Sequence, residues 1–140
     1  MGIKYYSEDI PFPKLKRREI TRWINNVIDS EGKNSGDISF VFCSDAYLLE
    51  INRKFLNHNY YTDIVTFDYV VGDLISGDIF ISIERIAENS VKFHTTLDNE
   101  LRRVLVHGVL HLIGYKDKSE DDKLEMSSKE DYYIKVLSDS

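Results

Sequence analysis

Two histidines, His107 and His111, stand four positions apart inside an apolar run, and an acidic residue, Asp117, follows ten positions after the first of them. A spacing of four places both imidazoles on one face of a helix, one turn apart. Imidazoles in that arrangement are typical ligands of one transition-metal ion. Gly114 fits the position where a helix ends, so the chain can turn back and bring Asp117 towards the histidines. The spacing therefore predicts a metal centre with His107, His111 and Asp117 as ligands.

The residue directly after the first histidine limits which metal-dependent reaction the site can perform. The spacing His-x-x-x-His-x-x-Gly-x-x-ligand equals that of the metzincin zinc proteases. Those proteases place a glutamate general base directly after the first histidine, whereas this chain has Gly108. A glycine there costs roughly 1 kcal/mol in a helix interior, unless it serves the close approach of another element. Without the glutamate a peptidase would lack its proton acceptor, so peptide hydrolysis is disfavoured.

Length and composition indicate an ordinary globular protein. The 140 residues, 42% hydrophobic and 30% charged, predict a single domain over 1–140, which the histidine motif would make a metal-dependent hydrolase domain. No apolar run reaches the roughly 18 residues of a membrane span, and the start does not resemble a signal peptide. The single Cys43 cannot form an internal disulfide, which favours the cytoplasm. A net charge of −6 argues against non-specific nucleic-acid binding, although a basic cluster occupies 14–22.

The apolar periodicity predicts an α+β fold, with a small mixed sheet of about four strands packed with about five helices. The helix over 96–114 is apolar nearly all round, which is typical of a buried central helix. Burying two imidazoles there is costly unless they find partners, so we expect a metal site at its C-terminal end. The expected strands are 3–6, 37–43, 64–71 and 74–82, and the expected helices are 13–29, 45–55, 83–93, 96–114 and 119–136.

At this point the sequence resembles a known family. The segment from His107 to Tyr115 is similar to the His-Gly-x-Leu-His-Leu-x-Gly-Tyr core of the YbeY family. Other segments agree with that family in order and spacing. They are Asn52-Arg-Lys-Phe55 with Thr62-Asp-Ile-Val-Thr-Phe67, Gly77-Asp-Ile-Phe-Ile81, and 100–106. The resemblance covers about 37–131.

The resemblance implies a function. Members of this family are metal-dependent, single-strand-specific endoribonucleases that act in 16S rRNA 3′-end maturation and ribosome quality control. It implies one Zn²⁺ per chain, an RNA substrate, and rRNA, the small ribosomal subunit and ribosome-associated proteins as partners. The expected catalytic group is a metal-bound water, because zinc lowers the pKa of water from about 16 to about 7. No protein general base is assigned, and attack by an RNA 2′-hydroxyl stays open.

The sequence departs from the family pattern in two places. The family usually reads Gly-Tyr-Asp-His, with that histidine as third ligand, whereas this chain has Lys116 and Asp117. A carboxylate can replace an imidazole on zinc. Most members also carry an arginine after the Asn-x-x-Tyr segment, where this chain has Leu56. Arg53, Lys54 and His58 are the candidates for its phosphate contact, and the sequence does not choose among them.

Nearby side chains have both functional and structural explanations. Tyr60 and Tyr61, in a polar loop, suit stacking on unpaired bases and packing about equally. Phe67 and Tyr69 alternate along a strand and are expected to pack. Asp63 and Asp78 would orient the histidine N–H groups as carboxylates beside the metal ligands, or cap a turn or strand end.

Two other functions remain open. The chain could be a non-catalytic ribosome-assembly factor with a structural zinc site, or a zinc hydrolase of another substrate class. The sequence does not decide the RNA site cut, the native metal or the oligomeric state.

Overall fold

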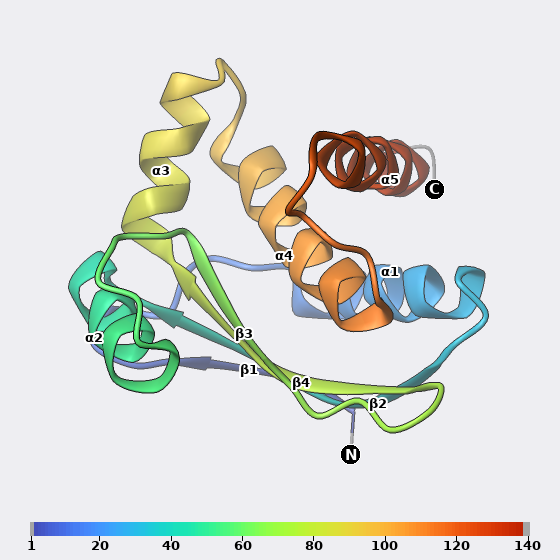
Figure 1. The fold of residues 1–140 in the computed structure, drawn as a ribbon. Helices are drawn as coiled ribbons and strands as arrows, with labels where there is room; N and C mark the ends of the chain where they lie inside the picture. Colours follow the sequence, from blue (N-terminus) through green and yellow to red (C-terminus); the bar gives the residue numbers. More distant parts are fainter. Residues whose placement is uncertain (1, 139–140) are drawn as a thin grey trace.

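The structure, a computed structural model, describes residues 2–138 as a four-stranded mixed sheet with five helices (Figure 1). This confirms the predicted α+β class. The elements in chain order are β1 (Ile3–Ser7), α1 (Arg17–Ser30), β2 (Asn34–Cys43), α2 (Asp45–Leu56), β3 (Ile64–Asp68), β4 (Leu74–Ser82), α3 (Ile83–Lys92), α4 (Leu97–Ile113) and α5 (Glu120–Ser138).

The sheet has the order β1-β2-β4-β3. β1 pairs with β2 in parallel, because α1 returns the chain to the same end of the sheet, and β4 also pairs with β2 in parallel, because the antiparallel strand β3 returns the chain after α2. β3 runs antiparallel to β4 and joins it through a turn in which Gly72 has a φ of +60°. The antiparallel edge strand β3 therefore lies beside β4 and next to α4.

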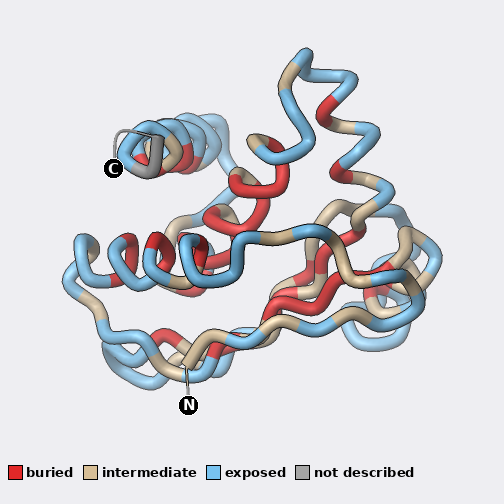
Figure 2. Tube along the Cα trace, turned by 180° about the vertical axis from the view of Figure 1, so that it is seen from behind, coloured by how far each residue is buried: buried red, intermediate tan, exposed pale blue. Residues whose placement is uncertain are grey.

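The helices cover the two faces of the sheet unequally. α1 and α4 pack on one face and build the main core with the inner side chains of β2 and β4, such as Phe40, Phe42, Ile79 and Ile81. Figure 2 shows this burial concentrated on α4, the central strands and the inner side of α1. α2 covers only one end of the opposite face, where Leu48 packs with Cys43 and Val65.

α4 is the central helix, as predicted. It starts at the cap Thr96, whose hydroxyl accepts from the Asn99 N–H, and it ends at Gly114 with a φ of +127°. A Cβ on Gly108 would lie 3.0 Å from Ile64 Cδ1 and from Ile79 Cγ2. The glycine therefore serves the close approach of α4 to the sheet. Neither α4 nor any other helix within residues 2–138 is both long and apolar enough to cross a bilayer.

Three predicted boundaries are wrong by a few residues. α1 begins at Arg17 and not at residue 13, because the preceding chain is irregular and packs Phe12 against Phe42, with ring centroids 5.8 Å apart. β3 ends at Asp68, where the carboxylate accepts from the Val70 N–H and starts the turn. β2 begins at Asn34, three residues early, and continues through an irregular pairing before Ile38.

Candidate functional site

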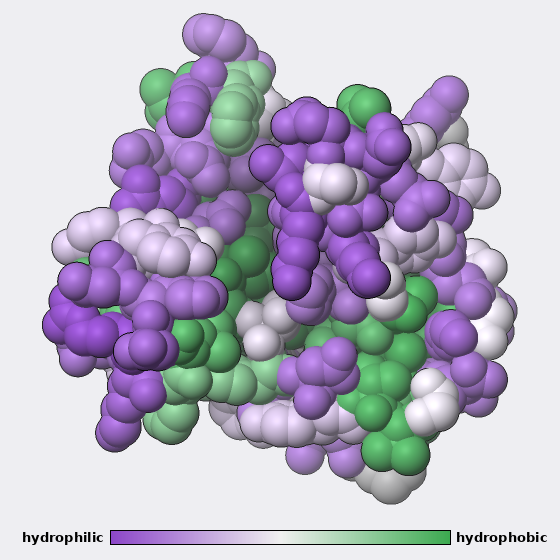
Figure 3. Space-filling model, viewed as in Figure 1, coloured by the Kyte–Doolittle hydropathy of each residue, from purple (hydrophilic) through white to green (hydrophobic). Residues whose placement is uncertain are grey.

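Two cavities meet at the C-terminal half of α4. The first, of about 410 Å³, lies between β3, the loop before it and the loop after α4. The second, of about 340 Å³, lies between β3, α3, α4 and α5. Figure 3 shows the surface hollowed here, between α3 and α5. The lining of each includes His107 and Asp117. We call the first the basic cavity, for His58, His111, Lys116 and Lys118, and the second the acidic cavity, for Asp63, Glu100 and Glu130.

His107 lies where the cavities meet, with its side chain 24% exposed. Its Nδ1–H donates to Glu130 Oε2 over 2.6 Å, and its Nε2 lies 3.8 Å from Asp117 Oδ2. Burial lowers the pKa of this imidazole, but the Glu130 hydrogen bond and charge outweigh burial and raise it. A carboxylate on Nδ1 fixes the ring and leaves Nε2 as the ligand atom, as is usual for metal-binding histidines.

His111, one turn further along α4, is exposed and lines the basic cavity. Burial of its ring and then the neighbouring His107 lower its pKa, so its imidazole is neutral at pH 7 and suited to metal binding. The loop after α4 folds back over the last turn, because the Tyr115 N–H donates to the Leu110 carbonyl. His111 therefore escapes burial in the core, and at His107 the hydrogen bond to Glu130 offsets the cost of burial.

The three predicted ligands share one cavity. Their donor atoms are of the kinds that zinc prefers. The 3.8 Å between His107 Nε2 and Asp117 Oδ2 is close to the separation of two ligands on one ion with bonds of about 2 Å. Within residues 2–138, however, no three His, Cys, Asp or Glu side chains already stand close enough together to enclose an ion. The three residues therefore fit zinc in the type of their donor atoms, and His107 and Asp117 also fit it in their separation.

Glu130, the carboxylate that holds His107, was not among the predicted site residues. It extends from α5 and is 6% exposed, and its other oxygen accepts from Arg103 Nη1 over 3.1 Å. The sequence does contain a signal for it. Met126, Glu130 and Tyr133 are spaced by four and three, and all three are buried on an otherwise polar helix. An acidic residue within such a stripe indicates a buried partner.

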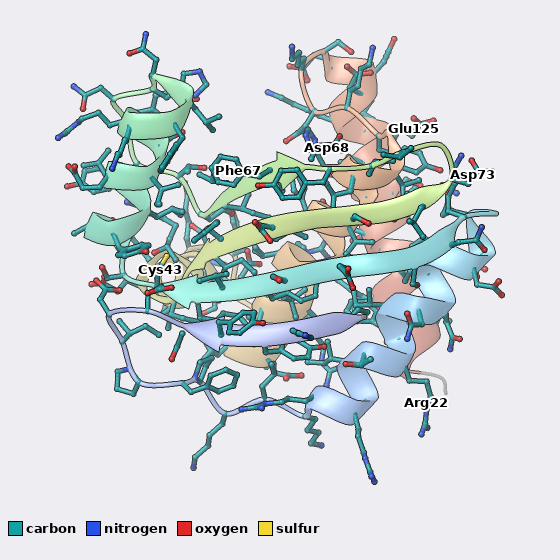
Figure 4. All side chains as sticks on the ribbon, turned by 90° about the horizontal axis from the view of Figure 1, so that it is seen from below. Arg22, Cys43, Phe67, Asp68, Asp73 and Glu125 are labelled. Carbon is teal, nitrogen blue, oxygen red and sulfur yellow. The ribbon has the colours of Figure 1, made fainter. Side chains whose placement is uncertain are left out.

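Asp63 and Asp78 were the two carboxylates expected beside the histidines. Asp63 lines the acidic cavity, and burial raises its pKa, while the nearby His107 acts in the opposite direction. Asp78 alternates on β4 with Ile79, which faces α4, so Asp78 lies on the other face of the sheet, where burial and then the Asp78 charge raise the pKa of Tyr69. Figure 4 looks onto that face, which α2 covers only near Phe67 and Cys43. The structure brings Asp63, and not Asp78, to the site.

The loop over 57–62 forms one wall of the basic cavity. Asn52, which is 2% exposed, donates from Nδ2 to the Tyr60 carbonyl over 3.0 Å and so ties this loop to α2. The His58 and Tyr60 rings stack with centroids 5.2 Å apart, and their polar atoms Nδ1 and OH lie 3.1 Å apart. Tyr60 remains 56% exposed. The pair presents a preformed aromatic surface beside the histidines.

The other predicted RNA-binding residues point elsewhere. Arg53 donates to Glu50 and Asn59, Lys54 lies over the Phe55 ring, and Tyr61 lies under the Arg85 guanidinium at 5.6 Å. Among the described residues, the lysines that line the basic cavity are Lys116 and Lys118, and Leu56 lines it too. These two lysines flank the predicted ligand Asp117 but were not among the predicted site residues.

These features define an α+β protein whose histidine and carboxylate side chains lie at the end of a buried helix, between two cavities of opposite charge. A family model described as Endoribonuclease YbeY matches residues 3–138. The chain belongs to the YbeY family.

Individual relatives agree with this assignment. The chain is 46% identical to a protein named Endoribonuclease YbeY from Parabacteroides distasonis, over 98% of this chain and 96% of the relative. It is 49% identical to one of the same name from Flavobacterium psychrophilum, over 94% of each. The solution structure of TM1509 from Thermotoga maritima aligns with a TM-score of 0.65 at 23% identity, covering 96% of this chain and 88% of that one. That likeness supports the fold.

Proposed function

We propose that this chain is an endoribonuclease that cuts single-stranded RNA at the junction of the two cavities. The family model and the relatives are named Endoribonuclease, which supports the RNA-cleaving part of the proposal. The observation that carries the proposal is the setting of His107, whose Nδ1 is held by Glu130 and whose Nε2 faces Asp117 beside two lysines. Such a centre suits reactions at phosphodiesters, in which negative charge develops on oxygen.

We propose His107, His111 and Asp117 as the residues that hold one Zn²⁺. Zinc supplies Lewis acidity and lowers the pKa of water. The chain's own residues do the remaining work. Glu130 orients His107, Lys116 and Lys118 hold phosphates by charge, and the stacked His58 and Tyr60 offer a face to an unpaired base.

The biological role we propose is 16S rRNA 3′-end maturation and ribosome quality control. The support is the resemblance to the family in the histidine motif and in the segments that precede it. In this proposal the substrate is rRNA on the small ribosomal subunit, with ribosome-associated proteins as partners. We also propose a cytoplasmic setting, because the single Cys43 is buried and suits a reducing compartment.

The test compares the wild-type chain with His111→Ala and with His94→Asn as a matched control. His94 lies away from both cavities with a φ of +54°, a conformation that asparagine tolerates. We expect about one zinc per chain and cleavage of single-stranded but not double-stranded RNA. His111→Ala should lose most of the zinc and at least a hundredfold of the cleavage rate, while His94→Asn retains both.

Two outcomes would replace the proposal. If zinc-loaded wild-type protein binds ribosomal subunits but cuts no RNA, and His111→Ala only lowers the melting temperature, the chain is an assembly factor with a structural metal. If it cuts peptides or amides and not RNA, it is a hydrolase of another class.

A further inference from the structure

In the acidic cavity His107, Asp117 and Glu130 have roles in the proposed function, but Glu100 has none. This residue lies in the first turn of α4 and is 3% exposed. Glu100, Val104 and His107 are spaced by four and three, so they share one face of the helix, and all three line the acidic cavity. Within residues 2–138 the Glu100 carboxylate makes no hydrogen bond and no ion pair. The fully buried side-chain atoms without a partner among the described residues are Arg85 Nε and Arg102 Nη1, so the Glu100 oxygens are not sealed off and open onto the cavity.

No charged side chain near Glu100 donates a hydrogen bond to its carboxylate. Arg103 is the nearest cation, but its Nη1 donates to Glu130 over 3.1 Å and its Nη2 to Asp131 over 2.7 Å. Asp63 faces the same cavity and acts on Glu100 as a like charge. Glu100 and Asp63 therefore face one space, and Asp63 accepts from its own backbone N–H whereas no group among the described residues donates to Glu100. A ligand that enters this space must bring hydrogen-bond donors.

The volume of the acidic cavity and the residues at its rim suit a small aromatic ligand. Its volume of about 340 Å³ falls within the range of small-molecule sites, about 300–1,000 Å³. Phe93, at the end of α3, contributes an aromatic face at the rim and is 57% exposed, and Asn89 contributes an amide. The cavity adjoins the basic cavity at His107 and Asp117. Its carboxylates repel phosphate, so the RNA backbone would follow the basic cavity and a base would enter the acidic one.

We propose, resting on the proposed function, that the acidic cavity holds one base beside the cleaved phosphodiester and that Glu100 selects guanine. Guanine presents two adjacent donors, N1–H and N2–H₂, that match the two oxygens of one carboxylate. Adenine and cytosine present a single amino donor next to a ring acceptor, and uracil presents one N–H between two carbonyls. The Phe93 ring stacks on the base, and the Asn89 amide can donate to guanine O6.

Cleavage-site mapping on a pool of short single-stranded RNAs tests this specificity. A good bidentate pair discriminates a base by about tenfold or more, so the zinc-loaded wild-type chain should cut next to guanine at least tenfold more often than next to adenine. Replacing the guanine with inosine, which lacks the N2 amine, should remove most of that preference. Glu100→Gln should reduce the ratio below about threefold, while Glu125→Gln, an exposed residue on α5, should keep it.

Binding of mononucleotides gives a readout that does not depend on cleavage. In protein-detected NMR, GMP should shift the signals of Phe93 and Val104 at lower concentration than IMP or AMP, and Glu100→Gln should abolish the difference. Phe93→Ala should weaken all three nucleotides without changing their order. The inference is overturned if the chain cuts RNA without regard to guanine, or if Mg²⁺ or Mn²⁺ alone shifts these signals through Glu100 and GMP does not. Absence of any RNA cleavage with intact GMP selectivity would instead overturn the proposed function.

Discussion

The two cavities at His107 differ in both charge and construction. The basic cavity takes its lysines and aromatic rings from loops, over 57–62 and 115–118, whereas the acidic cavity takes Glu100 and Glu130 from the packed helices α4 and α5, beside Asp63 and Asp117 from loops. Loops adapt to a flexible backbone, and packed helices hold side chains in fixed positions. From this difference we infer that one cavity binds the RNA phosphates and the other selects the base, although both share His107.

The same comparison explains how a chain with a net charge of −6 can act on RNA. Overall charge averages over the whole molecule, but a phosphate experiences mainly the charges within a Debye length of about 10 Å. Lys116 and Lys118 line the basic cavity, while the carboxylates Asp63, Glu100 and Glu130 line the neighbouring one. Local arrangement, and not net charge, decides what binds.

The largest effect is expected from reversing the charge of the two lysines in the basic cavity. Lys116→Glu combined with Lys118→Glu should weaken single-stranded RNA binding by about a hundredfold, and the slope of log affinity against log salt should fall by roughly 1.4, since each lost phosphate contact contributes about 0.7. Fluorescence anisotropy across a salt series measures both. The matched control, Lys123→Glu with Lys135→Glu on the exposed side of α5, changes net charge equally. An equal loss in the control would mean that general charge, and not the cavity, governs binding.

The next largest effect is expected on zinc affinity, from changing Glu130, which holds His107 between the two cavities. Glu130→Gln keeps the shape of the side chain but removes the charge that holds His107 Nδ1. Loss of such a partner typically weakens metal binding by about 10–100-fold. Competition for zinc with a fluorescent chelator measures the change, and RNA binding through Lys116 and Lys118 should stay within about threefold of wild type. Unchanged zinc affinity would show that Glu130 does not orient a ligand.

A smaller effect concerns the anchor of the loop that carries Asp117. Glu31, just after α1, accepts hydrogen bonds from Tyr115, Tyr133 and Lys129. Burial raises the pKa of this carboxyl, but the three donors outweigh burial and hold it below its ordinary value of 4.5. Because the pKa is depressed in the folded state, the stabilisation is present above about pH 4.5 and is lost as the pH falls through the folded value.

Glu31→Gln should therefore lower the free energy of unfolding by about 1–2 kcal/mol at pH 7. The gap to wild type should narrow as the pH falls below 4.5. Urea titrations at several pH values measure this difference. Glu125→Gln, which is exposed, provides the reference with no gap at any pH. A gap that widens towards acid would reverse the sign of the linkage.

The smallest effect is expected on stability, from changing Gly108, where α4 packs closely on the sheet. Gly108→Ala gains helix propensity of about 1 kcal/mol, but its Cβ would meet the side-chain ends of Ile64 and Ile79 at 3.0 Å. These methyl groups can yield by a few tenths of an ångström, so we expect a net loss of stability below about 1 kcal/mol. The guanine preference should not change. A clear gain in thermal unfolding temperature would mean that α4 does not depend on the missing side chain.

Much of the fold and the centre of the site could be predicted from local patterns. The spacing of His107 and His111, the end of the helix at Gly114 and the alternation along the strands are properties of neighbouring residues, which periodicity reports directly. The boundary at Arg17 could not be predicted, because the irregular chain before it packs Phe12 against Phe42 of a strand distant in the sequence. Glu130 lies 23 positions from His107, and its role depends on how α5 docks.

The sequence by itself therefore determined the helix that carries the histidines, the α+β class and the resemblance to the family, because each rests on residues that are close along the chain. Only the tertiary structure decided that Glu130 and not Asp78 supports His107, and that Lys116 and Lys118 and not Arg53 line the cavity. It also decided that Glu100 faces an unfilled acidic space. Burial and charge pairing depend on which elements pack together, and packing joins residues whose separation in the sequence carries no local signal.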